Sequence, residues 1–234
     1  MASYVIHGTS LDNLVHILKS GYLETNPKYG RKFLDKEHYN PHQIFTQILF
    51  KDLPDEVHQQ PHWWGIAIVL DKKILKDKRW YATRIGGFRE HFNDAFQKKT
   101  QKTMKNEEKD FQEPSEILAR NPNTAAAKIP SLAKLKKIII QQMESRFLGE
   151  VDFIHSHEVL FGDDISLAEY GVAIVCHEWL ITKKLSPTAR ENITKRCHEL
   201  GLPLILYGGA KRSDANKNLG INKFIDLIEY GNIS

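Results

Sequence analysis

The chain has 234 residues, 41% of them hydrophobic and 26% charged, with a formal net charge of +4. This composition is typical of a globular protein, and the length suits one large domain or two small ones. No apolar run approaches the 18 residues of a membrane-spanning helix, and the first ten residues do not resemble a secretory signal. Two cysteines form no disulfide framework, so we expect a reducing, cytoplasmic location without a membrane partner.

The predicted elements begin with a strand at 4–6 and a helix over 11–18, whose apolar residues recur at helical spacing. Ser10 is placed to cap this helix, and Gly21 is placed to end it. After a long loop at 24–42, the next predicted elements, in chain order, are strands at 43–50 and 63–71, one helical turn near 72–77, and a short strand or loop at 79–84.

The second half continues with a charged helix and then turns to strands. We expect helices at 88–112 and 131–143, strands at 151–161, 170–178 and 203–208, and helices near 188–200 and 221–229. There is no internal repeat. The pattern predicts one α+β domain over 1–234, with a mixed sheet and a basic helical insertion around 88–145.

The positive charge is concentrated in one segment. Residues 72–109 hold twelve Lys and Arg against five Asp and Glu, a local excess of seven that exceeds the net charge of the chain. A solvated helical face would account for this excess. The alternative is a surface that binds phosphates or nucleic acid.

The junction His7-Gly8-Thr9-Ser10 joins the first strand to the first helix. His7 and Thr9 point to one face of the strand because side chains alternate, and Gly8 leaves its backbone open to close approach. An imidazole, hydroxyls and bare backbone at one strand end suit a polar ligand that carries ribose hydroxyls and an amide. A turn with an ordinary capped helix is the alternative.

A second candidate is Glu158, a single charge in a strand-like run. A carboxylate in such a run is costly unless it has a partner or faces a cleft, although an edge-strand glutamate facing water would also fit. The same alternation places His155 and His157 on the face opposite Glu158. A two-histidine phosphoesterase would instead pair His7 with one of these histidines as general acid and base.

Three further readings rest on single clusters. A zinc site could draw on His155, His157, Cys176 and His177, but their spacing matches no zinc signature, and we expect no metal. Neither cysteine stands at a recognisable nucleophile turn. Tyr81 lies in an aromatic cluster beside the basic segment and is the preferred residue to stack on a base or on nicotinamide.

The opening stretch, YVIHGTSLDNLVHILKSGYL, resembles the first strand and helix of the ADP-ribosyltransferase superfamily. The later stretch HEVLFGDDISLAEYGVAIV is similar to the strand that bears the catalytic glutamate of that superfamily. The order of the elements resembles DarT-type DNA ADP-ribosyltransferases, with features of the His-Tyr-Glu group. The first match is carried by His7, Gly8, Thr9, Asn13, Leu14, Ile17, Leu18 and Gly21, and the second by Glu158, Val159, Leu160, Ile165 and Leu167.

This resemblance implies a split mixed sheet that binds NAD as a co-substrate. It implies that His7 holds a ribose hydroxyl, that the Gly8 backbone bonds the nicotinamide amide, and that Thr9 or Ser10 supports them. Glu158 would bond the 2′-hydroxyl of the nicotinamide ribose and stabilise the oxocarbenium-like state. Arg31 would meet the pyrophosphate. The His-Tyr-Glu group also has a tyrosine after its second strand, and this chain departs from that pattern, because Tyr81 lies later and in a different context.

The resemblance leaves the acceptor open between nucleic acid and protein. Relatives that modify arginine often carry Glu or Gln two residues before the catalytic glutamate, where this chain has Ser156. The tRNA 2′-phosphotransferases also open with HGT, but their set of arginines has no counterpart here. We therefore expect a mono-ADP-ribosyltransferase, with the phosphoesterase and a non-catalytic nucleic-acid-binding module as alternatives. The oligomeric state is not predicted.

Overall fold

The computed structural model describes residues 2–25, 44–53, 65–83, 131–148, 158–209 and 220–231. These residues confirm an α+β protein with a mixed sheet. The chain divides into two compact units, one made of residues 1–79 and 161–234 and the other of residues 80–160.

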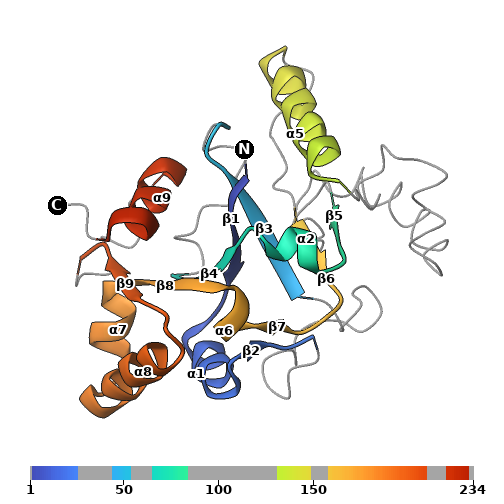
Figure 1. Cartoon of the computed structure of the whole chain (residues 1–234). Coiled ribbons are helices and arrows are strands. Elements are labelled where there is room, and N and C mark those ends of the chain that lie inside the picture. The colour runs from blue at the N-terminus through green and yellow to red at the C-terminus, as the bar shows by residue number, and fades with distance from the viewer. Residues whose placement is uncertain are drawn as a thin grey trace, which may run out of the picture. The chain divides into compact units, whose positions relative to one another are not determined.

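The sheet of the first unit has the strand order β3-β1-β4-β8-β9 (Figure 1). Its strands pair antiparallel except for the last two, which pair parallel, so the sheet is mixed. Because β4 runs antiparallel to both of its neighbours, the C-terminal ends of β1, β8 and β9 all lie at the same end of the sheet. The strands are β1 (Ala2–Gly8), β3 (Ile44–Phe50), β4 (Ile66–Asp71), β8 (Gly171–His177) and β9 (Leu204–Tyr207).

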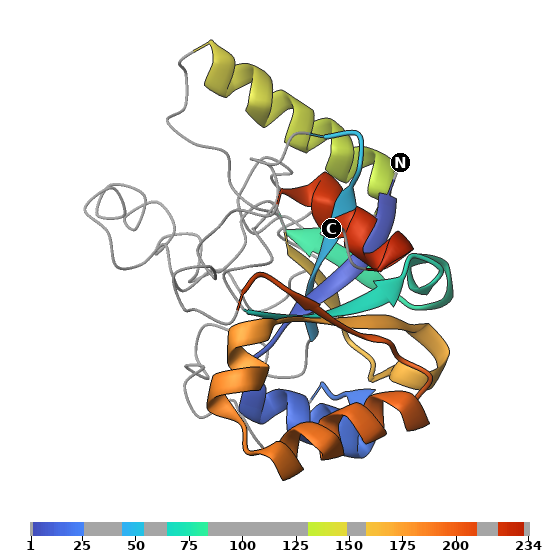
Figure 2. The same cartoon turned by 90° about the vertical axis from the view of Figure 1, so that its left-hand side faces the viewer.

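Helices cover both faces of this sheet. Helix α9 (Ile221–Tyr230) lies on one face, and α1 (Leu11–Ser20) and α8 (Pro187–Glu199) lie together on the other (Figure 2). Burial against α9 follows the alternation of the strands. The apolar cluster beneath α9 includes Ile6, Leu49, Ala67, Val69, Ala173, Val175 and Tyr207, with Ile221, Phe224, Ile225 and Leu227 from the helix itself.

Helix α1 begins and ends where the sequence predicts. The Ser10 side chain accepts a hydrogen bond from the Asn13 backbone N–H at 3.3 Å, and Gly21 ends the helix in the left-handed conformation at φ 77°. Both features are standard helix signals, because a side-chain oxygen satisfies an orphan N–H and glycine adopts positive φ without strain. Gly21 leads into a two-stranded sheet of β2 (Tyr22–Leu23) and β7 (Ile165–Ser166).

Several short elements complete the first unit. Helix α2 (Ile74–Asp77) is the helical turn that the sequence predicts, and α6 (Leu167–Tyr170) occupies residues between β7 and β8. Helix α7 (Glu178–Lys184) follows β8 directly. The second unit holds β5 (Trp80–Thr83), α5 (Leu132–Phe147) and the first three residues of β6 (Glu158–Phe161), with β5 and β6 as neighbours.

Around β8 the structure differs from the sequence prediction in two ways. The strand predicted at 170–178 is Gly171–His177, because Tyr170 ends α6 and Glu178 begins α7. The prediction of one helix between the last two strands is wrong, since α7 and α8 both lie there. The cause is His177, whose ring accepts from the Trp179 N–H and caps α7 at the strand end.

Some predicted elements lie outside the described residues, among them the charged helix at 88–112 and most of the strand predicted at 151–161. Among the helices that the structure does describe, none is both long and apolar enough to cross a membrane.

Candidate functional site

The end of β1 places the His7 ring against the neighbouring strand. Nδ1 of His7 lies 2.8 Å from the backbone carbonyl oxygen of Phe45 in β3. A carbonyl only accepts hydrogen bonds, so Nδ1 is the donor, and in the neutral ring Nε2 is then an acceptor. The partly buried imidazole is therefore held in one orientation at the strand end.

The Gly8 backbone points toward the β3 side of β1. The Thr9 N–H donates to the Ile66 carbonyl of β4 at 3.1 Å, so by antiparallel alternation Thr9 and His7 bond toward β4. Gly8 must then direct its N–H and C=O the other way. The ladder of β1 with β3 ends at the pair Ile6 and Gln47, whereas the ladder with β4 continues to Gly8 and Ala67. The Gly8 amide therefore faces the place where β1 and β3 part.

Thr9 and Ser10 complete this strand end in different ways. The Thr9 side chain is 7% exposed, and its hydroxyl has no hydrogen-bond partner among the residues that the structure describes. A buried hydroxyl without a partner costs free energy and calls for a partner such as a water or a ligand. Ser10 is exposed and caps α1. Of the two hydroxyls, Thr9 has the environment of a ligand-binding group and Ser10 that of a helix cap.

Replacing Ser10 tests this division of roles. Ser10→Ala is expected to lower the free energy of unfolding by about 1 kcal/mol, because it leaves the Asn13 N–H without its cap. Ser10→Asp retains a capping oxygen and is expected to leave stability within about 0.5 kcal/mol of the original. Urea unfolding of both variants measures the difference. Equal losses of stability in the two variants would show that Ser10 does not stabilise the protein as a helix cap.

The remaining predicted site residues lie elsewhere or outside the described residues. Glu158 is the first residue of β6 and belongs to the second unit, whereas His7 belongs to the first. Tyr81 lies within β5, also in the second unit. Arg31 lies outside the described residues. The structure thus brings together His7, Gly8, Thr9 and Ser10, and the roles assigned to Glu158, Tyr81 and Arg31 stay predictions.

A pair of polar side chains, His177 and Tyr207, lies at the same end of the sheet, and the sequence did not predict this pairing. His177 ends β8 and Tyr207 ends β9, and the two rings meet edge to face with their centroids 5.1 Å apart. Their pairing follows from the parallel register of β8 and β9, which puts them side by side. The sequence signal was the strand ending of LILY before Gly208 and Gly209, but it carried no information about the partner strand.

The zinc reading is not tested as a whole, because His155 and His157 lie outside the described residues, whereas both cysteines are described. The described residues contain no group of three or more His, Cys, Asp or Glu arranged to hold a metal ion. Cys176 and His177 are consecutive in β8, so their side chains point to opposite faces. Burial raises the pKa of the Cys176 thiol to about 12 and that of Cys197 to about 11, so both thiols stay protonated at neutral pH. Such thiols are poor nucleophiles.

The phosphoesterase reading is not tested, because His155 and His157 lie outside the described residues. Of the basic segment, only residues 72–83 are described. Within it, the ammonium groups of Lys73 and Lys78 lie 5.4 and 5.8 Å from the centroid of the Tyr170 ring. These cation–π contacts hold two of the positive charges at the surface of the first unit.

Comparison of the chain with protein-family models gives no match, and comparison with curated protein sequences gives none either.

Proposed function

We propose that this protein is an NAD-dependent mono-ADP-ribosyltransferase that transfers ADP-ribose to a macromolecular acceptor and releases nicotinamide. The proposal joins the resemblance of the two sequence stretches to one structural observation, the end of β1. Glu158 is its catalytic residue, and His7, Gly8 and Thr9 bind the NAD.

The end of β1 supports the proposal because it offers the hydrogen-bonding groups that NAD requires. The Gly8 backbone faces the side where β1 and β3 part, and it carries one donor and one acceptor. A carboxamide such as that of nicotinamide also has one acceptor oxygen and an NH₂ donor, so the two match in both directions. The anchored His7 ring and the buried Thr9 hydroxyl add groups suited to ribose hydroxyls.

The proposed chemistry breaks the bond between C1′ of the ribose and the pyridinium nitrogen. The electron pair of that bond leaves with the nicotinamide, which becomes neutral, and positive charge develops on the ribose. The Glu158 carboxylate stabilises this charge and holds the 2′-hydroxyl. A lone pair of the acceptor then forms the new bond to C1′, and the acceptor loses a proton. NAD is already activated, so the protein contributes positioning and electrostatics.

The test is incubation of the purified protein with NAD labelled in its adenylate part and a lysate of proteins and nucleic acids. We expect nicotinamide release together with label in macromolecular material. Digestion with nuclease or protease then identifies the acceptor class, because only the correct enzyme releases the label. Absence of both nicotinamide release and label transfer would contradict the proposal.

A further inference from the structure

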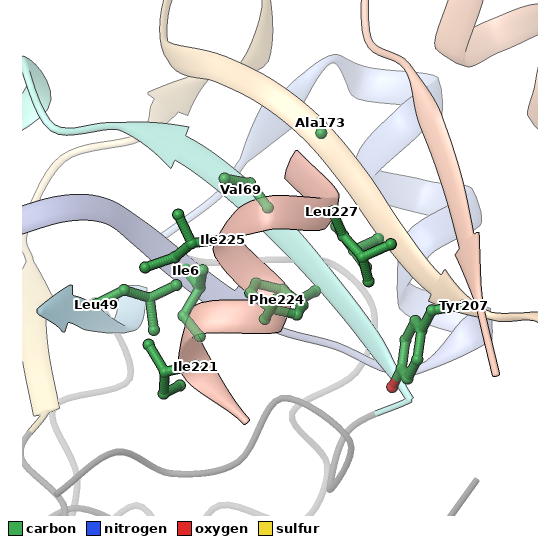
Figure 3. Close-up of a cluster of buried hydrophobic side chains, with 11 residues drawn as sticks. Ile6, Leu49, Val69, Ala173, Tyr207, Ile221, Phe224, Ile225 and Leu227 are labelled. Carbon is green, nitrogen blue, oxygen red and sulfur yellow. The ribbon is translucent and has the colours of Figure 1, made fainter. Parts of the chain in front are cut away.

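His177 and Tyr207 form a buried polar pair at the end of the sheet where β1, β8 and β9 terminate. Their side chains are 1% and 8% exposed. They lie on the face covered by α9, and Figure 3 shows Tyr207 at one end of the apolar cluster beneath that helix. Two polar rings at the end of an otherwise apolar face require a physical explanation.

The contact between His177 and α7 determines which nitrogen of the His177 ring carries the proton. Nδ1 of His177 accepts from the Trp179 backbone N–H at 3.1 Å, so Nδ1 carries no proton and the neutral ring carries it on Nε2. That Nε2–H is buried and has no hydrogen-bond acceptor among the described residues. His177 is therefore a fixed donor without an acceptor.

Tyr207 has the same need. Its hydroxyl is buried without a hydrogen-bond partner in the described part of the chain. Burial, with a smaller contribution from Cys176, raises the pKa of the phenol above its ordinary value, so the hydroxyl stays protonated. Each unmet buried donor costs about 1–3 kcal/mol. Two such donors at the same end of the sheet call for acceptors, such as the oxygen of a water or of a ligand.

The backbone of Gly208 lies close to the His177 ring. Gly208 follows Tyr207 at φ 75°, and a methyl group added to it would lie only 2.5 Å from Nε2 of His177. Any side chain at position 208 would therefore press on the donor atom of His177. Glycine at this position therefore leaves room for the His177 ring.

The pair is aligned with the end of β1 across a single sheet. Gly8 pairs with Ala67 and Ala67 with Val175, so His177 stands two residues beyond the Gly8 row. The His177 side chain points to the face covered by α9, whereas His7 and Thr9 alternate with Ile6 and point to the opposite face. A ligand that contacts both places has to pass around the strand ends. Strand spacing and rise put the two Cα atoms roughly 12 Å apart. A single ring cannot contact both places, but a dinucleotide is long enough to do so.

We propose that His177 Nε2–H and the Tyr207 hydroxyl bind a ribose hydroxyl in the adenosine half of NAD. This inference rests on the proposed function. Because both groups are neutral, they suit a neutral oxygen better than a phosphate, which needs charge to compensate it. The assignment extends the binding site around the strand ends from β1 to β8 and β9, to two residues outside the resemblance.

The test compares binding of ADP-ribose and of nicotinamide by calorimetry in the intact protein and in Tyr207→Phe. This substitution removes one oxygen and retains the ring, so the fold is expected to persist. We expect affinity for ADP-ribose to fall about three- to tenfold, the equivalent of one neutral hydrogen bond, and affinity for nicotinamide to stay unchanged. His177→Asn, which retains a capping oxygen but is too short to place a donor at the position of Nε2, should show the same selectivity. Tyr230→Phe, on the exposed end of α9, is the matched control.

The outcomes separate this inference from the proposed function. Unchanged ADP-ribose affinity in Tyr207→Phe, in a protein that releases nicotinamide from NAD, would overturn the inference alone. Weakened ADP-ribose binding in a protein that releases no nicotinamide would support the inference and overturn the proposed function. If the intact protein binds no ADP-ribose, the inference fails.

Discussion

Glu158→Gln is expected to slow nicotinamide release from NAD by about two to three orders of magnitude. Glutamine retains the shape of the side chain and can still bond a ribose hydroxyl, but it carries no charge. The charge matters most when the ribose becomes cationic, so the loss should appear in kcat and leave KM nearly unchanged. Steady-state kinetics of nicotinamide release measure both constants.

The control for this variant is Glu191→Gln, on an exposed position of α8 in the first unit. It removes the same charge from the chain and is expected to retain the original rate. Equal thermal stability of the two variants shows that the fold is unaffected. A Glu158→Gln protein with a rate within twofold of the original would remove Glu158 from the catalytic role.

Local patterns predicted the elements whose signals lie within a few residues of each other. Helix α1 has apolar residues at helical spacing, the Ser10 cap and the Gly21 stop, and the structure confirms all three. Strand β4 is a nearly continuous apolar run and β3 is apolar except for Thr46 and Gln47, and both formed within the predicted ranges. These signals act through local backbone geometry and burial, so the sequence alone carries them.

Elements that depend on a side chain acting on the backbone were harder to predict. Helix α7 was missed because a histidine is an uncommon helix cap and the helix begins immediately after a buried strand. The His177 ring satisfies the Trp179 N–H, and this contact determines where β8 ends. Residue propensities reflect only the apolar run of β8 that precedes His177.

The candidate site divides in the same way. His7, Gly8, Thr9 and Ser10 are consecutive, so the sequence already placed them together. The direction of the Gly8 amide depends on which ladder continues past Ile6, and this depends on β3 and β4, dozens of residues away. The His177 and Tyr207 pair depends on the parallel pairing of β8 with β9, across 30 residues of chain. Long-range register of this kind cannot be read from local periodicity.

Phe224→Ala should cost about 3–5 kcal/mol of the free energy of unfolding, the range for removing a buried aromatic ring. Phe224 is fully buried beneath α9, where it belongs to one cluster with Ile6, Val69 and Tyr207 (Figure 3). The loss combines the transfer of the ring to water with the cavity that it leaves, and it is a large part of the 5–15 kcal/mol that stabilises a typical domain. Urea unfolding followed by circular dichroism measures it.

Tyr230→Ala on the same helix provides the comparison, because Tyr230 is 76% exposed. It removes an aromatic ring of similar size from the same element and is expected to change stability by no more than about 0.5 kcal/mol. A loss below about 1 kcal/mol for Phe224→Ala would show that α9 is not anchored on this sheet face. Anchoring matters for the proposed site because α9 covers the face on which Tyr207 ends β9. If α9 detached, the Tyr207 hydroxyl would be exposed to water, so Phe224→Ala should also weaken ADP-ribose binding, whereas Tyr230→Ala should not.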